Sequence, residues 1–273
     1  MSPVLLMAAR EIRAGLRNRW VVAATGLLAI LALVLGFLGS APAGEVDAGA
    51  LTVSVVSLSS LSIYLLPLLA LLLTYDAIVG ELEDGTLLLL LAYPLSRWQL
   101  ITGKFVGHAA ILAFATVVGF GLAGAAIAFT GTVGDQGIRA FAGLIGSSVV
   151  LGWVFIGVGY LLSVLVQERS TAAGLAVTVW LLLVVLYDMA LLATLTATGG
   201  EGAIGQAVPA LLLFNPADAY RLFNLAGLSE VASFSGLGAA GGGIALGWTL
   251  LSLVAWLTVP LGLAWLIFRR REL

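Results

Sequence analysis

The stretch FAGLIGSSVVLGWVFIGVGYLLSVLV, residues 141–166, has no charged side chain at any position. A bilayer core of roughly 30 Å is crossed by about 20 residues of α-helix, so this stretch is long enough to span a membrane. Its apolar residues are continuous rather than alternating with polar ones, which argues against a strand of a membrane barrel. Five further stretches share this character, and together they predict an all-α integral membrane protein. The six predicted spans are Trp20–Leu38, Val53–Thr74, Phe105–Thr130, Phe141–Val166, Thr171–Leu195 and Ile244–Phe268.

The composition agrees with this class and excludes others. Hydrophobic residues make up 61% of the 273 residues and charged residues only 10%, whereas a soluble surface is about 25–35% charged. The net charge is −2 and the longest basic run is Arg269 to Arg271, so we expect no nucleic-acid partner. There is no cysteine and one histidine, His108, so we expect no metal site and no bound cofactor. We treat residues 1–273 as a single transmembrane domain.

The positions of lysine and arginine predict the orientation of the spans. Arg139 and Arg221 fall on one side, and the other ten basic residues fall on the other side. Six spans place both termini on the same side, so we expect a multi-pass protein of the bacterial inner membrane with both termini in the cytoplasm. The first apolar stretch is longer than the about 7–15 residues of a signal-peptide core, so we expect it to stay as a span. The ten residues are Arg10, Arg13, Arg17, Arg19, Arg97, Lys104, Arg169, Arg269, Arg270 and Arg271.

Residues 1–19 predict an amphipathic helix. Arg10, Arg13 and Arg17 recur at helical spacing between apolar residues, which favours a helix lying on the inner leaflet in contact with membrane lipids. The alternative is a basic flank that only sets the orientation of the first span. In either case the segment anchors that span.

The richest polar stretch, YDAIVGELEDGT at residues 75–86, precedes five leucines, Leu87–Leu91, that are too few to cross a bilayer. Pro94 breaks a helix, and Ser96 with Gln99 matches a capping box that starts the next one. We predict that residues 75–104 form a cytoplasmic elbow of short helices whose acidic side chains lie beside an apolar run, a combination that favours docking of another protein over a merely solvated face. The predicted docking residues are Glu81, Glu83, Asp84, Gly85, Thr86 and Arg97.

The outer loop, residues 196–243, separates the fifth and sixth predicted spans. Asn215 is a good cap for a helix that begins at Pro216 and runs to about Ala226, and we expect it to face the outer membrane interface or a partner. The glycine-rich residues 236–243 form a flexible lead into the last span. The predicted partner-facing residues are Asn215, Pro216, Asp218, Tyr220, Arg221 and Phe223.

No motif of an active site is present. The chain lacks a Walker lysine motif, a zinc-protease motif and a nucleophile-elbow motif, so we expect that it is not an enzyme. Asp188 is the one carboxylate inside a predicted span, where it has either a conduction or gating role or a structural one. Small residues spaced by four, such as Gly119 with Ala123 and Gly143 with Ser147, predict close packing of helices.

With these features together, the chain resembles the membrane subunits of ABC-2 type transporters. The resemblance rests on the basic N-terminal helix, on ELEDGTL at residues 81–87, on YPLSR at residues 93–97 and on Gly103-Lys104. It implies a homodimer in which the elbow contains a coupling helix that docks on a separate ATPase subunit, where ATP and Mg²⁺ bind. Within the family the chain is similar to permeases that act with an ATPase and a periplasmic repeat protein in maturing the copper sites of nitrous oxide reductase. That likeness implies a periplasmic accessory protein as a further partner.

Other functions remain open at this point. The chain could be an export permease for another substrate, an ion-coupled or proton-coupled carrier that uses Asp188, or a passive anchor for a periplasmic protein. A carrier should depend on Asp188 and tolerate changes in the elbow, whereas an anchor should tolerate changes in both.

Overall fold

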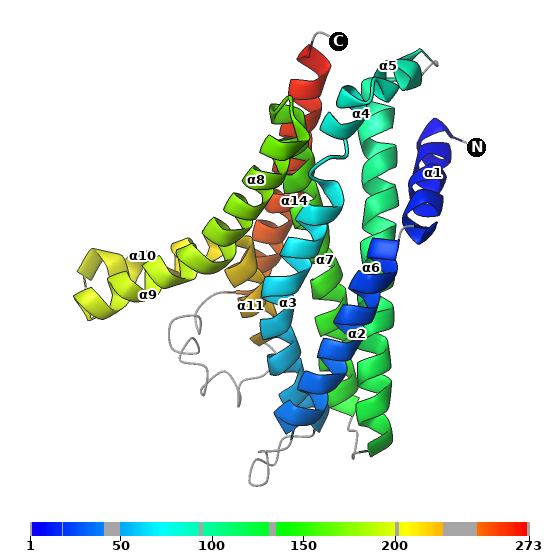
Figure 1. Cartoon of the computed structure of the whole chain (residues 1–273). Helices are drawn as coiled ribbons and strands as arrows, with labels where there is room; N and C mark the ends of the chain where they lie inside the picture. The colour runs from blue at the N-terminus through cyan, green and yellow to red at the C-terminus, as the bar shows by residue number, and fades with distance from the viewer. Residues whose placement is uncertain are drawn as a thin grey trace.

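The computed structural model describes residues 2–17, 19–40, 50–92, 95–130, 135–199, 202–225 and 245–271, and every regular element in these ranges is a helix (Figure 1). One helical turn, η1, is π-helical and joins α8 to α9 without a break. The elements are α1 (Pro3–Arg17), α2 (Arg19–Ser40), α3 (Ala50–Thr74), α4 (Val79–Glu83), α5 (Thr86–Leu91), α6 (Arg97–Thr130), α7 (Asp135–Leu165), α8 (Arg169–Trp180), η1 (Leu181–Leu186), α9 (Tyr187–Thr198), α10 (Gly202–Phe214), α11 (Pro216–Leu225) and α14 (Leu246–Arg270).

Five helical stretches are long and apolar enough to cross a membrane, and they correspond to the second to sixth predicted spans. The first predicted span falls on α2, which meets α1 at a bend of 69° and makes a sixth crossing if the two helices are taken as one bent pair. The chain is therefore a multi-pass membrane protein. Both termini lie at the end of the bundle where α4 and α5 are found (Figure 1), as an even number of spans requires. Which side of the membrane this end faces stays a prediction.

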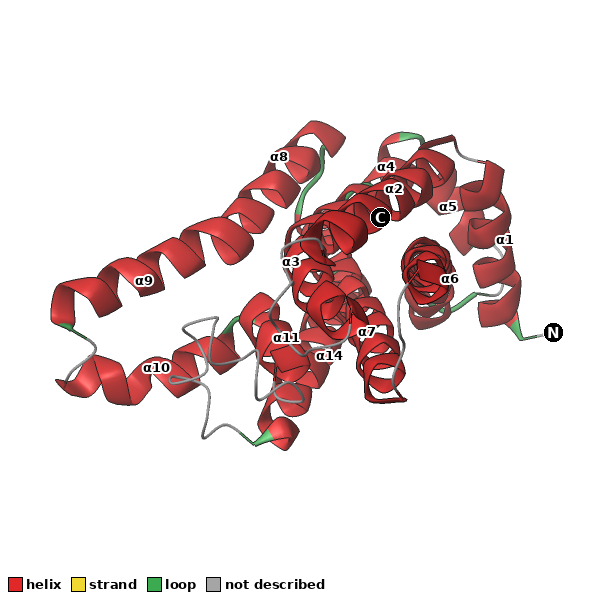
Figure 2. Cartoon of the chain, turned by 90° about the horizontal axis from the view of Figure 1, so that it is seen from below, coloured by secondary structure: helices red, strands yellow, loops and turns green. Residues whose placement is uncertain are grey.

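Helix α7 occupies the centre of the bundle, with α3, α6 and α14 packed around it. Its side chains Leu151, Val154 and Phe155 are fully buried, which accounts for the uninterrupted apolar run of the sequence. The continuous helix α8–η1–α9 instead leans away from the bundle (Figure 2), and its leucines Leu182 and Leu192 are exposed. Its apolar surface is thus available to lipid or to another protein.

The predicted outer loop contains more helix than expected. Residues 202–214 form α10, which sequence reasoning left in a loop, and α11 follows after a single residue. With 13 residues α10 covers about 20 Å, too short to span a bilayer, and it contains Pro209. Its short length and its internal proline are the reasons that the sequence did not predict this helix. The predicted end of the next helix at Ala226 and the glycine-rich residues 236–243 lie outside the described residues.

Small residues allow close helix contacts, but not all at the predicted pairs. A Cβ atom built on Gly119 would lie 3.2 Å from the backbone nitrogen of Ala29, so α2 and α6 approach closely there. A Cβ atom on Gly143 would meet nothing within 4 Å. Further close contacts of this kind join α1 to α6, and they belong to the site described next.

Candidate functional site

The two short helices α4 and α5 form the elbow at one end of the bundle (Figure 1). The chain leaves α3 in a turn whose backbone N–H groups, those of Ile78 and Val79, donate to Ser163 Oγ on α7 at 2.9 and 3.1 Å. Gly85 then takes φ +68°, a left-handed conformation that suits glycine, and it separates α4 from α5. Thr86 closes the same corner by donating its hydroxyl to the Glu81 carbonyl oxygen. The start of the elbow is therefore bonded directly to the central helix.

Glu81 points into the protein rather than outward, which differs from the prediction that it is displayed on the elbow. Its Oε1 lies 3.0 Å from Lys104 Nζ on α6 and 3.5 Å from Arg10 NH1 on α1, and its side chain is 15% exposed. Lys104 is only 4% exposed. A buried ammonium group is strongly destabilised unless an acid accompanies it, so Lys104 draws Glu81 inward.

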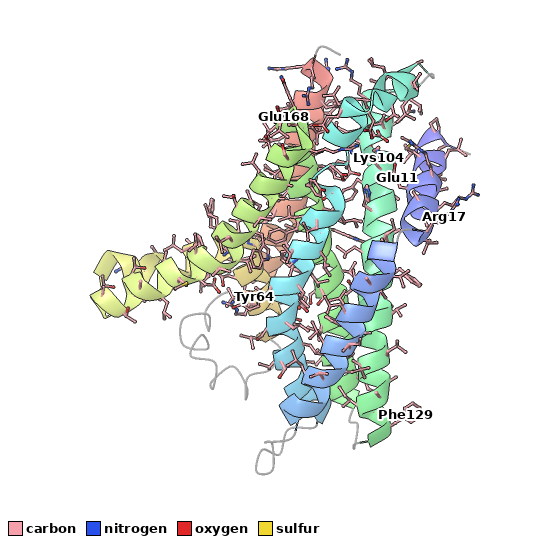
Figure 3. All side chains as sticks on the ribbon, viewed as in Figure 1. Glu11, Arg17, Tyr64, Lys104, Phe129 and Glu168 are labelled. Carbon is pink, nitrogen blue, oxygen red and sulfur yellow. The ribbon has the colours of Figure 1, made fainter. Side chains whose placement is uncertain are left out.

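The same lysine also binds α1. Glu11 Oε1 lies 3.0 Å from Lys104 Nζ, and Figure 3 shows these two side chains between α1 and α6. Burial favours the neutral form of Glu11, but the neighbouring Lys104 and His108 lower its pKa below the ordinary value. His108 continues the network, because its Nδ1 lies 2.7 Å from the Tyr160 hydroxyl on α7. One polar network thus joins α1, α4, α6 and α7.

Two glycines bring α1 close enough for these contacts. A Cβ atom on Gly103 would lie 2.6 Å from Met7 Cβ, and one on Gly107 would lie 2.5 Å from Glu11 Cβ. These residues are four apart on α6, so they make a flat surface on which α1 rests. The predicted position of α1 on the inner leaflet is untested, but α1 is packed on α6 along its length.

Glu83 and Asp84 are more exposed, and both contact Arg169 at the start of α8. The Arg169 guanidinium donates to an Asp84 carboxylate oxygen and, at 2.8 Å, to the Gly80 carbonyl oxygen. The Arg169 backbone N–H donates to Glu83 Oε1 at 2.8 Å. Since Glu83 and Asp84 are 36% and 56% exposed, they face solvent while tying the elbow to α8.

Arg97 caps a helix that is distant in sequence. Its NH1 group donates to the carbonyl oxygens of Phe268 and Arg271, both at 2.7 Å, and to that of Arg269 at 3.0 Å. These carbonyl groups lie at the end of α14, where a helix lacks its usual N–H partners, although that of Phe268 also accepts the Arg271 N–H at 3.3 Å. Both hydrogen bonds of the predicted capping box are present, from the Ser96 N–H to Gln99 Oε1 and from the Gln99 N–H to Ser96 Oγ. Arg97 therefore closes this end of the bundle.

The apolar run of the elbow divides between interior and surface. Leu87 is fully buried, whereas Leu88 and Leu89 are 56% and 68% exposed at the tip of α5. These two leucines therefore form an exposed apolar surface on α5, with the exposed Asp84 nearby in sequence. The acidic residues that drew attention in the sequence serve mainly to hold the elbow in place.

The predicted partner-facing helix α11 is buried, contrary to the prediction. Tyr220 has no exposed surface, and its hydroxyl lies 2.8 Å from Ser148 Oγ on α7. Asn215 is equally buried: its Oδ1 accepts the Ala217 N–H as a cap, while its Nδ2 donates to the Leu183 carbonyl oxygen in the π-helical turn. Pro216 is buried at the start of the helix and Phe223 is half-buried. The helix belongs to the interior because its polar side chains bond to α7 and η1.

Asp188 forms an ion pair with a base on another helix. Its Oδ2 lies 2.7 Å from Arg221 NH2 on α11, and Arg221 NH1 lies 2.8 Å from Asp218 Oδ1. The sequence placed Asp188 in a span and Arg221 in a loop, which hid their pairing. The other residues that sequence reasoning missed are Glu11, Lys104 and Arg169, for which the only signal was an unexplained charge beside an apolar run.

Comparisons with known proteins agree with this architecture. The family model described as ABC-2 family transporter protein matches residues 5–273. A probable ABC transporter permease protein NosY from Stutzerimonas stutzeri is 47% identical over 281 residues, covering 99% of both chains. A probable ABC transporter permease protein NosY from Pseudomonas aeruginosa is 44% identical over 283 residues, covering both chains completely.

Proposed function

The chain belongs to the ABC-2 family of transporter proteins as a permease subunit similar to NosY, and from this premise we propose that its elbow docks on a separate ATPase subunit and transmits ATP-driven movement into the membrane. The ATPase would bind ATP and Mg²⁺, and this chain would bind no cofactor. The observation that carries the proposal is that α4 is bonded to four other helices while α5 exposes Leu88 and Leu89.

The bonds of the elbow give this proposal its mechanics. A partner that pushes on α5 would displace α4, because the two helices are separated by only two residues. Ser163, Lys104 and Arg169 would pass that displacement to α7, α6 and α8 respectively. Since a buried ion pair such as that of Lys104 with Glu81 resists separation, α6 in particular would move with the elbow rather than slide past it.

We further propose that the working unit is a homodimer in the bacterial inner membrane with both termini in the cytoplasm. The exposed apolar surface of α8–η1–α9 supports a second copy or lipid as its cover. The likeness to NosY permeases supports a role with a periplasmic partner in assembling the copper sites of nitrous oxide reductase. Export of another substrate is the alternative, and the pairing of Asp188 with Arg221 weighs against a carrier that depends on a free Asp188.

Docking is tested with a double variant of the elbow that carries both Leu88→Ala and Leu89→Ala. Its matched control is a double variant that carries both Leu5→Ala and Leu6→Ala. Leu5 and Leu6 on α1 are similarly exposed, at 53% and 55%, but lie outside the elbow. Each variant is purified in mild detergent, and the co-purified protein is identified by its nucleotide-binding motif and assayed for ATP hydrolysis. We expect the elbow variant to co-purify with about tenfold less ATPase than the control variant. A tenfold weaker affinity corresponds to a loss of about 1.4 kcal/mol in binding free energy.

Equal retention by the two double variants would refute docking through α5. Substitution of the acidic residues is a poorer test, because Glu81, Glu83 and Asp84 are all bonded within the chain. Their loss would confuse a docking defect with a folding defect.

A further inference from the structure

The polar cluster between α9 and α11 contains two acids and one base. Arg221 NH2 lies 2.7 Å from Asp188 Oδ2, and Arg221 NH1 lies 2.8 Å from Asp218 Oδ1. The side chain of Asp218 is 1% exposed, while those of Asp188 and Arg221 are 25% and 21% exposed. With every group ionised, the cluster would hold one excess negative charge around a buried carboxylate.

Two carboxylate oxygens in this cluster have no hydrogen-bond partner. Asp218 Oδ2 and Asp188 Oδ1 are both buried and unpaired among the described residues. An ionised carboxylate removed from water without donors is strongly destabilised. The buried Oδ2 of Asp218 therefore needs a hydrogen-bond donor or a proton.

The surrounding helices offer no second base within the described chain. The elements packed against α11 are α3, α7, α10, α14 and η1, and α10 and η1 contain no ionisable side chain. The acids and bases of α7 are Asp135 and Arg139 near its first turns, and those of α14 are Arg269 and Arg270 in its last turn.

Tyrosines are the remaining titratable neighbours. Tyr64 on α3 faces Arg221. The Tyr187 hydroxyl on α9 donates to the Leu211 carbonyl oxygen, and Tyr220 lies on α11 itself with its hydroxyl against Ser148 Oγ on α7. None of these groups supplies a positive charge. The described helices around the cluster therefore leave its two acids with a single base.

A proton is the ligand that fits. Burial raises the pKa of Asp218 to about 7; Arg221 opposes this increase and the Asp188 carboxylate adds to it. A neighbouring carboxylate disfavours ionisation of a buried acid, so Asp218 is the group that keeps a proton. A proton also needs no cavity and no further ligands, in keeping with the absence of any group of three metal-ligating residues in the described ranges.

We propose that Asp218, beside Arg221 and the Asp188 carboxylate, binds one proton and forms a proton site between α9 and α11. When the proton is bound, the charges of the three residues cancel and Asp218 has a hydrogen to donate. When it leaves, two carboxylates compete for one guanidinium, and the connection between α9 and α11 weakens. This inference does not depend on docking of an ATPase.

Infrared difference spectroscopy on the purified full chain tests the proposal, because a protonated carboxyl group has a carbonyl stretch that a carboxylate lacks. We expect the wild-type band to disappear as the pH rises through about 7 and to be absent from Asp218→Asn. Asp188→Asn is the decisive variant, since Arg221 would then pair with Asp218 alone. Its band should disappear at least about one pH unit lower, because removing a neighbouring like charge lowers a carboxyl pKa. Asp135→Asn, an exposed acid on α7, is the matched control and should leave the band unchanged.

Each other outcome overturns the proposal. A band that titrates identically in wild type and Asp188→Asn would mean that Asp218 is protonated by burial alone. The absence of a titrating band in wild type would mean that both acids are ionised. Loss of the band on addition of Na⁺ or K⁺ at constant pH would identify a cation site instead. If Asp218→Asn fails to fold, the partly exposed Asp188 still provides the test.

Discussion

The two buried ion networks of this protein differ by a single base. At the elbow, Glu11 and Glu81 are accompanied by Lys104 and Arg10, so acids and bases balance. Between α9 and α11, Asp188 and Asp218 share Arg221. The first network leaves one carboxylate oxygen buried and unpaired, Glu81 Oε2, and the second leaves two.

This difference separates a clamp from a titratable site. A balanced network pairs each buried acid with a base and holds α1, α4 and α6 together. In the unbalanced network, the proposed proton on Asp218 would be gained or lost near neutral pH, and the link between α9 and α11 would change with it. Both networks attach a short helix to the spans, but only one should respond to pH.

The largest effect is expected from Lys104→Met. The substitution leaves Glu11 and Glu81 buried as like charges without the ammonium group that lies 3.0 Å from each. Removing one partner of a buried ion pair costs about 3–5 kcal/mol. The measurement is the free energy of unfolding, obtained by titrating the detergent-solubilised protein with a denaturing detergent.

Arg10→Met is the matched control for this variant. Arg10 also contacts Glu81, but its side chain is 51% exposed, so its loss should cost at most about 1 kcal/mol. Similar losses for Lys104→Met and Arg10→Met would show that the network behaves as a surface cluster rather than a buried clamp.

A smaller effect, visible only as a change in how stability depends on pH, is expected from Asp218→Asn. The pKa of Asp218 is raised from 3.8 to about 7 in the folded protein, so the folded state binds more protons than the unfolded chain in this range. The contribution of Asp218 to stability is therefore present at low pH and is lost as the pH rises from about 4 to about 7. The variant should lack this decline, which is at most about 1.4 kcal/mol per pH unit.

The measurement is the midpoint of thermal unfolding at several pH values for wild type and Asp218→Asn. The two curves should converge or cross as the pH rises through this window. Parallel curves would contradict the assignment of a titrating group to this cluster and would remove the contrast with the elbow.

An effect smaller than that of Lys104→Met is also expected from Gly107→Ala, which tests the packing beneath the balanced network. The added Cβ atom would lie 2.5 Å from Glu11 Cβ and 3.1 Å from the Ala8 carbonyl oxygen, so α1 must move away from α6. Overpacking of this kind costs about 1–3 kcal/mol. Gly121→Ala on the same helix meets nothing within 4 Å and should be neutral or slightly stabilising. Protease sensitivity of the segment that joins α1 to α2 would report the displacement, and equal sensitivity in both variants would argue against close packing.

Much of the fold could be predicted because the bilayer imposes a simple rule on length and polarity. The apolar runs placed the spans, and the Ser96–Gln99 capping box placed the start of α6, where both of its hydrogen bonds are found. Helix α10 escaped because a 13-residue apolar helix with an internal proline resembles neither a span nor a loop. Local patterns predict elements, but they do not say which short helices fold back into the bundle.

The candidate site was predicted less completely for a related reason. The acidic residues of the elbow were predicted to form a docking surface. Instead, Glu81 points inward to Lys104, and Glu83 and Asp84 pair with Arg169. Those partners lie more than 20 positions away in sequence, where spacing carries no information about contact. The prediction for Tyr220 was wrong for the same reason. The sequence around it does not indicate that its hydroxyl contacts Ser148 on α7.

The cap that Arg97 places on α14 has a consequence for how the protein is made. The carbonyl groups that it binds lie 171 to 174 positions later in the chain, so these bonds cannot form until α14 has left the ribosome. Arg271 in turn donates to the carbonyl oxygens of Val164 and Val166 at the end of α7. The residues at the end of α14 thus join the ends of α6, α7 and α14, and a chain truncated before them leaves that end of the bundle open.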